Sequence, residues 1–175
     1  MPDHDDAWYE EWKRRMEADG NIILALGLRP LEEDAEHAVM EMPMSRNVRQ
    51  GTGVFAAGAL MQLADVAATM VCGQAAGEAG ADAFPLSVQV SMNLLRNTDH
   101  GKATAHSRLV HRGRTMMVVE SRVTDDDGRL LCIVTSTHVM APRRQPPNSP
   151  SPLEGDGAGG GDDPPLRLSE RGQGG

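Results

Sequence analysis

Apolar and polar residues alternate along several segments of the chain. In residues 86–95, Leu-Ser-Val-Gln-Val-Ser-Met-Asn-Leu-Leu, apolar side chains occupy positions 86, 88, 90, 92 and 94. A period of two is typical of a β-strand with one buried face. Further strands are predicted at 36–44, 102–111, 115–124 and 129–140.

Two turns between these segments contain a glycine. Gly113 follows His111-Arg112, and Gly128 follows a run of three aspartates. Each glycine stands where a hairpin can use a positive φ. The last three strands are therefore predicted to be antiparallel.

Residues 55–72 have a different pattern, because they are helical in propensity and apolar on nearly all sides. Asp65 is their only charged residue. A helix that is apolar all round is buried on most of its faces, and about 18 residues give a length of roughly 27 Å. One long buried helix and antiparallel strands predict an α+β fold in which a curved sheet wraps around the helix.

The two ends of the chain differ from this middle part. Residues 1–19 predict an acidic amphipathic helix, whose Trp8, Trp12 and Met16 form an apolar stripe suited to packing on the body or on a partner subunit. Residues 142–175 hold seven of the eleven prolines and eight of the nineteen glycines, which predicts a disordered tail. The folded domain is therefore expected at 20–141.

Composition excludes several classes of function. The formal net charge is −8, which argues against binding to nucleic acid or to an acidic membrane surface. Two cysteines without metal or disulfide spacing suit a reducing compartment. Since no apolar run approaches the roughly 18 residues of a membrane span and the start of the chain does not read as a signal peptide, a cytoplasmic protein is expected.

Asp65 is the first candidate for chemistry. On a helical wheel its neighbours Gly58, Met61, Thr69 and Cys72 are uncharged, so the carboxylate projects from an apolar stripe. A carboxylate in a partly desolvated cleft is a common general base or nucleophile. The alternative is a structural aspartate that accepts hydrogen bonds from a strand or caps a neighbouring element.

The start of the same helix is the second candidate. Residues 50–58 form a glycine-containing loop that runs into the helix N-terminus, where free N–H groups and the helix dipole attract developing negative charge. A carbonyl oxygen bound there would occupy an oxyanion hole. The alternative is an ordinary loop.

The remaining candidates are weaker. The six histidines show no metal-ligand spacing, so no metal site is expected. Cys72 and Cys132 stand in apolar segments and are expected in the core. Ser87 and Thr69 have hydroxyls that can orient water or a carbonyl group, although such hydroxyls usually bond to nearby backbone.

Taken together, these segments resemble a known family. Residues 50–69, followed by Leu86-Ser-Val-Gln-Val-Ser-Met-Asn-Leu-Leu-Arg96, His111-Arg-Gly-Arg114 and Asp126-Asp-Gly-Arg-Leu130, resemble the hotdog-fold acyl-CoA thioesterases of the phenylacetate-degradation (PaaI-like) type. The resemblance covers roughly residues 20–141. It implies a hotdog fold and the hydrolysis of a medium-chain or aromatic acyl-CoA to free acid and coenzyme A.

The resemblance also implies roles for single residues. Asp65 takes the position of the catalytic carboxylate, Gln50 that of an amide that holds water or the thioester, and Ala57 that of the glycine whose N–H polarises the carbonyl. Gly58, Thr69 and Ser87 fall at substrate-binding positions. The family's His-Gly-Gly is Ala56-Ala57-Gly58 here, and Asn97 replaces a proline.

Assembly and ligands follow from the same resemblance. Two protomers pair their sheets edge to edge, as a homodimer or within a homotetramer, and Asp65 of one chain faces Gln50 and Ala57 of the other. Coenzyme A enters as part of the substrate and no separate cofactor is expected. Arg96, Arg112 and Arg114 are candidates for contact with its phosphates.

Two other functions stay open. A hotdog module that binds acyl-CoA without turnover is the main alternative, because the family histidine is absent and Ala57 adds a methyl group. A dehydratase of the same fold would need a catalytic histidine in the 50–58 loop, where this sequence has none.

Overall fold

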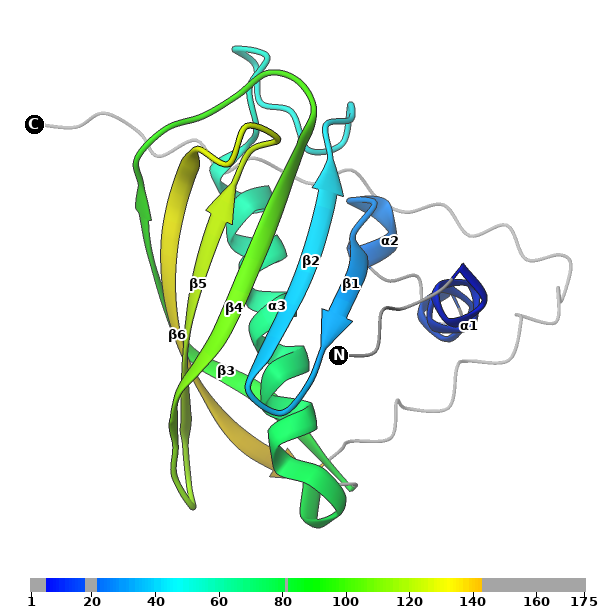
Figure 1. Cartoon of the computed structure of the whole chain (residues 1–175), viewed down its shortest axis with the longest axis vertical. Coiled ribbons are helices and arrows are strands. Elements are labelled where there is room, and N and C mark those ends of the chain that lie inside the picture. Colours follow the sequence, from blue (N-terminus) through cyan, green and yellow to red (C-terminus); the bar gives the residue numbers. More distant parts are fainter. Residues whose placement is uncertain (1–5, 18–21, 81, 143–175) are drawn as a thin grey trace, which may run out of the picture. The chain divides into compact units, whose positions relative to one another are not determined.

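The computed structural model describes residues 6–17, 22–80 and 82–142. One long helix, α3 (Ala57–Ala76), is enclosed by a six-stranded antiparallel sheet in the order β1-β2-β4-β5-β6-β3 (Figure 1). The strands are β1 (Arg29–Glu33), β2 (His37–Pro43), β3 (Ala83–Leu94), β4 (Lys102–Arg112), β5 (Met117–Thr124) and β6 (Leu130–Pro142). Three short or peripheral elements complete the list: α1 (Asp6–Glu17), α2 (Ile22–Ala25) and the 3-10 turn η1 (Gly77–Gly80).

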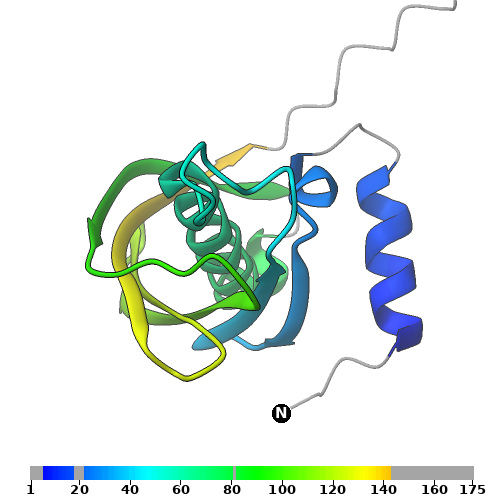
Figure 2. The same cartoon turned by 90° about the horizontal axis from the view of Figure 1, so that it is seen from above.

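The sheet curves around the helix, as the view along α3 shows (Figure 2). This confirms the predicted α+β architecture with a curved sheet and a central helix. Helix α3 fits inside the curve because many of its buried residues are small: Ala59, Ala64, Ala67, Ala68 and Ala75. Larger buried side chains such as Leu60 and Leu63 fill the space toward the strands, with Met40 and Met42 of β2 in the same cluster.

The five predicted strands are present, with ends that differ by a few residues. The single buried face predicted for 86–95 was wrong, because Leu86, Val88 and Leu94 are exposed and a bulge between Ser87 and Gln89 shifts the alternation.

The helix is longer at its C-terminus than predicted, because it continues through Val71-Cys72-Gly73-Gln74 to Ala76 before Gly77 ends it at φ +57°. A glycine inside a helix lowers helix propensity but does not terminate the helix where packing supports it.

Strand β1 was not predicted. Its sequence Arg-Pro-Leu-Glu-Glu shows no alternation, and Pro30 argues against a central strand. The structure places it at the edge of the sheet, paired with β2 and with a register irregularity between Pro30 and Glu32. An edge strand tolerates proline because one side of the strand needs no partner.

The two turn glycines serve different purposes. Gly128 has a φ of +75°, as the hairpin prediction required. Gly113 does not have a positive φ, so that part of the prediction was wrong. A side chain at Gly113 would place its Cβ 2.8 Å from His111 Nε2 and 2.9 Å from the Met116 carbonyl oxygen, so the turn needs glycine for space.

Helix α1 is joined to the body by its aromatic face. Trp12 is 6% exposed and belongs to the main hydrophobic cluster. Arg29 of β1 lies over the Tyr9 ring, 4.9 Å from its centroid, and pairs with Asp6 at 3.0 Å. These contacts agree with the prediction of a helix that packs on the body. The disordered tail was predicted at 142–175; Pro142 is instead the last residue of β6, and 143–175 lie outside the described residues.

Candidate active site

Asp65 lies in the middle of α3 and is partly exposed, whereas its neighbours Ala64 and Val66 are buried. Its side chain is directed toward β3, where the Ser87 hydroxyl donates a hydrogen bond to Oδ1 at 2.7 Å. The structure therefore brings together two of the residues singled out from the sequence. Asp65 is a carboxylate with one fixed partner and an incomplete cover of protein, which suits a group that must meet water or substrate.

A residue that the sequence analysis did not select completes this cluster. His138 is 0% exposed on β6 and is the register partner of Ser87 on β3. Its Nδ1 lies 3.3 Å from Ser87 Oγ, and its Nε2 lies 2.8 Å from Ser136 Oγ. Burial lowers the pKa of His138 below its ordinary value, although the Asp65 charge acts in the opposite direction. The ring is therefore neutral at neutral pH.

The sequence carried only a faint signal for His138. Along 129–140 it occupies the same alternate positions as Cys132, Val134 and Ser136, which are all buried. A histidine on the inward face of a strand suggests a polar partner inside the fold. That partner lies 51 residues away, in a strand that is not consecutive with β6, so only the register of β3 against β6 reveals it.

The N-terminus of α3 is the second candidate site from the sequence, and the helix begins at Ala57, within residues 50–58. Ala56 precedes the helix in an extended conformation, and its own N–H donates to the Val48 carbonyl at 2.8 Å. The N–H groups of Ala57 and Gly58 stand in the first turn, where no intrahelical acceptor exists. Among the described residues no acceptor for either N–H is found.

Gln50 lies in the turn that leads to this helix. Its N–H donates to the Val54 carbonyl and its carbonyl accepts from the Gly53 N–H, both at 2.9 Å. Gly53 has a φ of +93°, which the turn requires and which a side chain rarely adopts. The backbone of Gln50 is fixed in this way, and its side chain is exposed.

Asp65 and the helix start are separated along one chain. Asp65 follows Ala57 by eight positions, and at 1.5 Å per residue they are about 12 Å apart along the helix axis. A carbonyl oxygen bound to the Ala57 N–H places its carbon within about 4 Å of that nitrogen by ordinary hydrogen-bond geometry. The Asp65 of the same chain therefore does not reach that carbon.

The other predicted residues are not gathered at Asp65. Thr69 follows it by one helical turn and is half-buried, with no hydrogen bond to the carboxylate. Arg96, Arg112 and Arg114 are exposed, and no ion pair joins them to any described residue. Cys72 is 0% exposed, and burial together with the Asp65 charge raises the pKa of its thiol to about 12. It therefore behaves as a core residue, as predicted.

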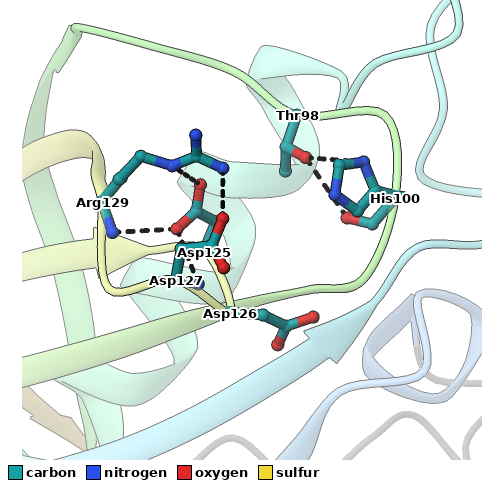
Figure 3. A pocket seen from close by; sticks show the side chains of 6 residues that line it. All are labelled: Thr98, His100, Asp125, Asp126, Asp127 and Arg129. Carbon is teal, nitrogen blue, oxygen red and sulfur yellow. Dashed lines mark hydrogen bonds and ion pairs between the residues drawn. The ribbon is translucent and has the colours of Figure 1, made fainter.

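A second group of titratable side chains surrounds the β5–β6 turn (Figure 3). Asp125 accepts hydrogen bonds from the backbone N–H groups of Asp127 and Arg129, at 3.1 Å and 2.8 Å, and from Arg129 Nε at 3.0 Å. Burial alone would raise the pKa of Asp125, but these bonds and the Arg129 charge lower it. The carboxylate is satisfied within its own turn, and within residues 6–17, 22–80 and 82–142 no acidic, histidine or cysteine cluster is arranged to hold a metal ion.

Comparison with known proteins agrees with this geometry. The thioesterase superfamily profile matches residues 52–132. PA1618 of Pseudomonas aeruginosa, named as an esterase, is 30% identical over 117 residues, which cover 67% of this chain and 79% of that protein. A crystal structure of a variant of PA1618, there named a thioesterase, has a TM-score of 0.69 at 26% identity and covers 81% of this chain and 99% of that one.

Two further relatives carry informative names. A protein of Listeria monocytogenes named 1,4-dihydroxy-2-naphthoyl-CoA hydrolase is 26% identical over 120 residues, 69% of this chain and 95% of that protein. A Streptococcus pneumoniae thioesterase structure with coenzyme A has a TM-score of 0.60 at 22% identity, over 68% of this chain and 92% of that one, and shows the shared fold.

The curved antiparallel sheet around α3, with a partly exposed carboxylate on that helix, is the hotdog fold of a thioester hydrolase. The chain belongs to the thioesterase superfamily. No helix in the described part of the chain is long and apolar enough to cross a membrane.

Proposed function

We propose that the protein hydrolyses a medium-chain or aromatic acyl-CoA to the free acid and coenzyme A, with Asp65 as general base or nucleophile. The observation that carries this proposal is the hydrogen bond from Ser87 to Asp65, the only charged residue of α3. The Listeria relative is named for an aromatic acyl-CoA, and the Streptococcus structure contains coenzyme A, which supports the substrate class.

The catalytic unit of this proposal contains two chains. Asp65 does not reach a carbonyl held at Ala57 of its own chain, so a second copy must supply one of the two groups. Strand β3 lies at the edge of the sheet and exposes Phe84, Leu86 and Val88, at 46%, 50% and 55%. An open strand edge with apolar side chains is suited to pairing with another copy, which joins two sheets into one.

The reaction follows from these groups. The Ala57 N–H polarises the thioester carbonyl, and the exposed Gln50 side chain assists in holding the thioester or the water. Asp65 either takes a proton from water as the water oxygen attacks the carbonyl carbon, or attacks that carbon itself to form a mixed anhydride. The C–S bond then breaks, the coenzyme A thiolate leaves and takes a proton, and water hydrolyses the anhydride in the second route.

The remaining residues bind the substrate in this proposal. Gly58 and Thr69 flank the acyl path on α3. Arg96, Arg112 and Arg114 are available to the phosphates of coenzyme A because they are exposed and pair with no acidic group in the described part of the chain. A guanidinium group matches phosphate geometry.

The test is replacement of Asp65 by asparagine, which keeps the shape and removes the base. Loss of a positioned general base lowers the rate by about 100- to 10,000-fold. Thiol release from a panel of acyl-CoA thioesters measures kcat and KM. Glu78→Gln, an exposed carboxylate in η1, is the matched control and is expected to keep the parental rate. An asparagine variant as fast as the parent would refute the assignment of Asp65.

A non-catalytic acyl-CoA-binding module is the second candidate, favoured by the Ala56-Ala57 pair in place of His-Gly. Titration calorimetry separates the two functions. Tight binding of an acyl-CoA without thiol release over hours would support the module, whereas turnover excludes it.

A further inference from the structure

We infer that His138 is a positioning residue for Asp65, acting through Ser87; this rests on the proposed function, in which Asp65 is the base or nucleophile. The structure joins four side chains from three elements in one line: Asp65 on α3, Ser87 on β3, and His138 with Ser136 on β6. The three contacts measure 2.7 Å, 3.3 Å and 2.8 Å in that order.

The direction of each hydrogen bond follows from the chemistry of the first group. A carboxylate that acts as base or nucleophile is ionised and only accepts, so Ser87 must donate its single proton to Asp65. The Ser87 oxygen is then left as an acceptor, and His138 Nδ1–H is the donor that faces it. In a neutral imidazole Nε2 carries no proton in this tautomer, so it accepts from the Ser136 hydroxyl.

Burial makes this arrangement stable. His138 is 0% exposed and Ser136 is 1% exposed, so no bulk water replaces a missing partner. Asp65 from α3 is the charged group that acts on the ring, while the register partners of His138 on the two flanking strands are the uncharged Ser87 and Met117. A neutral ring holds a single proton, and because the Ser87 proton is directed to Asp65, the ring proton is expected on Nδ1 and not toward Ser136.

The consequence for Asp65 is a fixed orientation. A serine hydroxyl rotates freely about its C–O bond, but His138 Nδ1–H on one side needs an acceptor and the Asp65 carboxylate on the other needs a donor, which leaves one arrangement. Oδ1 is then held by Ser87, and Oδ2 stays available for water or the carbonyl carbon. Consecutive hydrogen bonds that all donate in the same direction also polarise and strengthen one another in a site of low dielectric constant.

Two substitutions of the ring distinguish positioning from packing. Asparagine has an amide nitrogen on Cγ, in the place of Nδ1, whereas glutamine has its amide one atom further along, in the place of Nε2. We expect His138→Gln to lower kcat by about threefold to tenfold with little change in KM, and His138→Asn to recover part of that loss. Equal rates for both variants and the parent would overturn the inference.

A double-mutant cycle tests the route through Ser87. If His138 acts through that hydroxyl, His138→Gln has little further effect on kcat in a Ser87→Ala background. Fully multiplicative losses would contradict the route. Ser107→Ala is the matched control, because Ser107 is 1% exposed on the same sheet and makes a 2.7 Å hydrogen bond to Ser121; it is expected to reduce thermal stability and leave kcat unchanged.

Nuclear magnetic resonance gives a readout that does not depend on turnover. Long-range 1H–15N spectra of the labelled full chain, with the His138 signals assigned from the His138→Gln spectrum, should show the proton on Nδ1 at neutral pH. Ser136→Ala, which touches neither Asp65 nor Ser87, should mix the two tautomers and lower kcat. A proton on Nε2 in the parent, or His138 signals unchanged by Ser87→Ala, would overturn the inference.

These results separate the two proposals. If no acyl-CoA in the panel is hydrolysed, the proposed function fails, and the spectra still decide whether His138 and Ser87 are coupled. If hydrolysis depends on Asp65 but neither His138→Gln nor Ser136→Ala changes kcat, the proposed function stands and His138 is a packing residue.

Discussion

At the scale of single residues, Ala57 provides a direct test of the oxyanion site, because it is the first residue of α3. Proline is well tolerated at this position and lacks only the N–H. The preceding Ala56 has φ −68° and ψ 137°, which is the conformation that a following proline favours. The helix therefore should keep its structure in Ala57→Pro while losing the proposed donor.

We expect Ala57→Pro to reduce kcat by about 100- to 1,000-fold, the usual loss for one oxyanion donor. The melting temperature should stay near that of the parent, and thiol release with circular dichroism measures both quantities. Ala57→Ser, which retains the N–H, is the control for steric change. A proline variant with the parental kcat would show that this N–H does not contact the carbonyl.

The residue scale also shows what a sequence can reveal about this site. Asp65 was identifiable because a lone charge in an apolar helix needs an explanation. Ser87 was selected for its hydroxyl and from the family resemblance, whereas only the structure shows the bulge that follows it. Their contact is now a structural fact, while their catalytic roles stay predictions. His138 was missed because strand register, rather than any local pattern, brings it to Ser87.

At the scale of elements, the apolar patterns of the sequence predicted five strands and α3. Strand β1 has no such pattern and is recognisable as a strand only from its pairing with β2. Strand β3 is the element with the clearest consequence for assembly. Its first half exposes apolar side chains on an edge strand, and although Pro85 stands there, β3 has none of the charged residues that usually protect such an edge. The proposed two-chain site therefore predicts that a second copy covers this edge.

The double substitution Leu86→Lys/Val88→Lys tests this interface. Like charges from two copies would meet across the two-fold axis and oppose pairing. We expect the parent to elute as a dimer or tetramer and the variant as a monomer in size-exclusion chromatography with light scattering. Val110→Lys, at a side chain that is 54% exposed on β4, should leave the assembly intact. A variant with the parental mass would place the interface elsewhere.

At the scale of the whole molecule, the length of α3 decides how many chains make one site. The roughly 12 Å between Ala57 and Asp65 along the helix is a property of any α-helix and does not depend on details of packing. In the proposed function, a thioester therefore receives its oxyanion donor from one copy and its carboxylate from another. This arrangement predicts complementation between two inactive variants.

Asp65→Asn and Ala57→Pro each leave both sites of a homodimer defective, for different reasons. In a mixed dimer, one site combines the intact Ala57 of the first chain with the intact Asp65 of the second, and the other site holds both defects. Random pairing of equal amounts gives half mixed dimers, so the unfractionated mixture should recover about a quarter of the parental activity, and the doubly purified mixed dimer about half. Co-expression with two affinity tags, followed by thiol-release assays on the doubly purified dimer, measures this recovery. If both groups acted within one chain, each site of the mixed dimer would carry one defect and no activity would return.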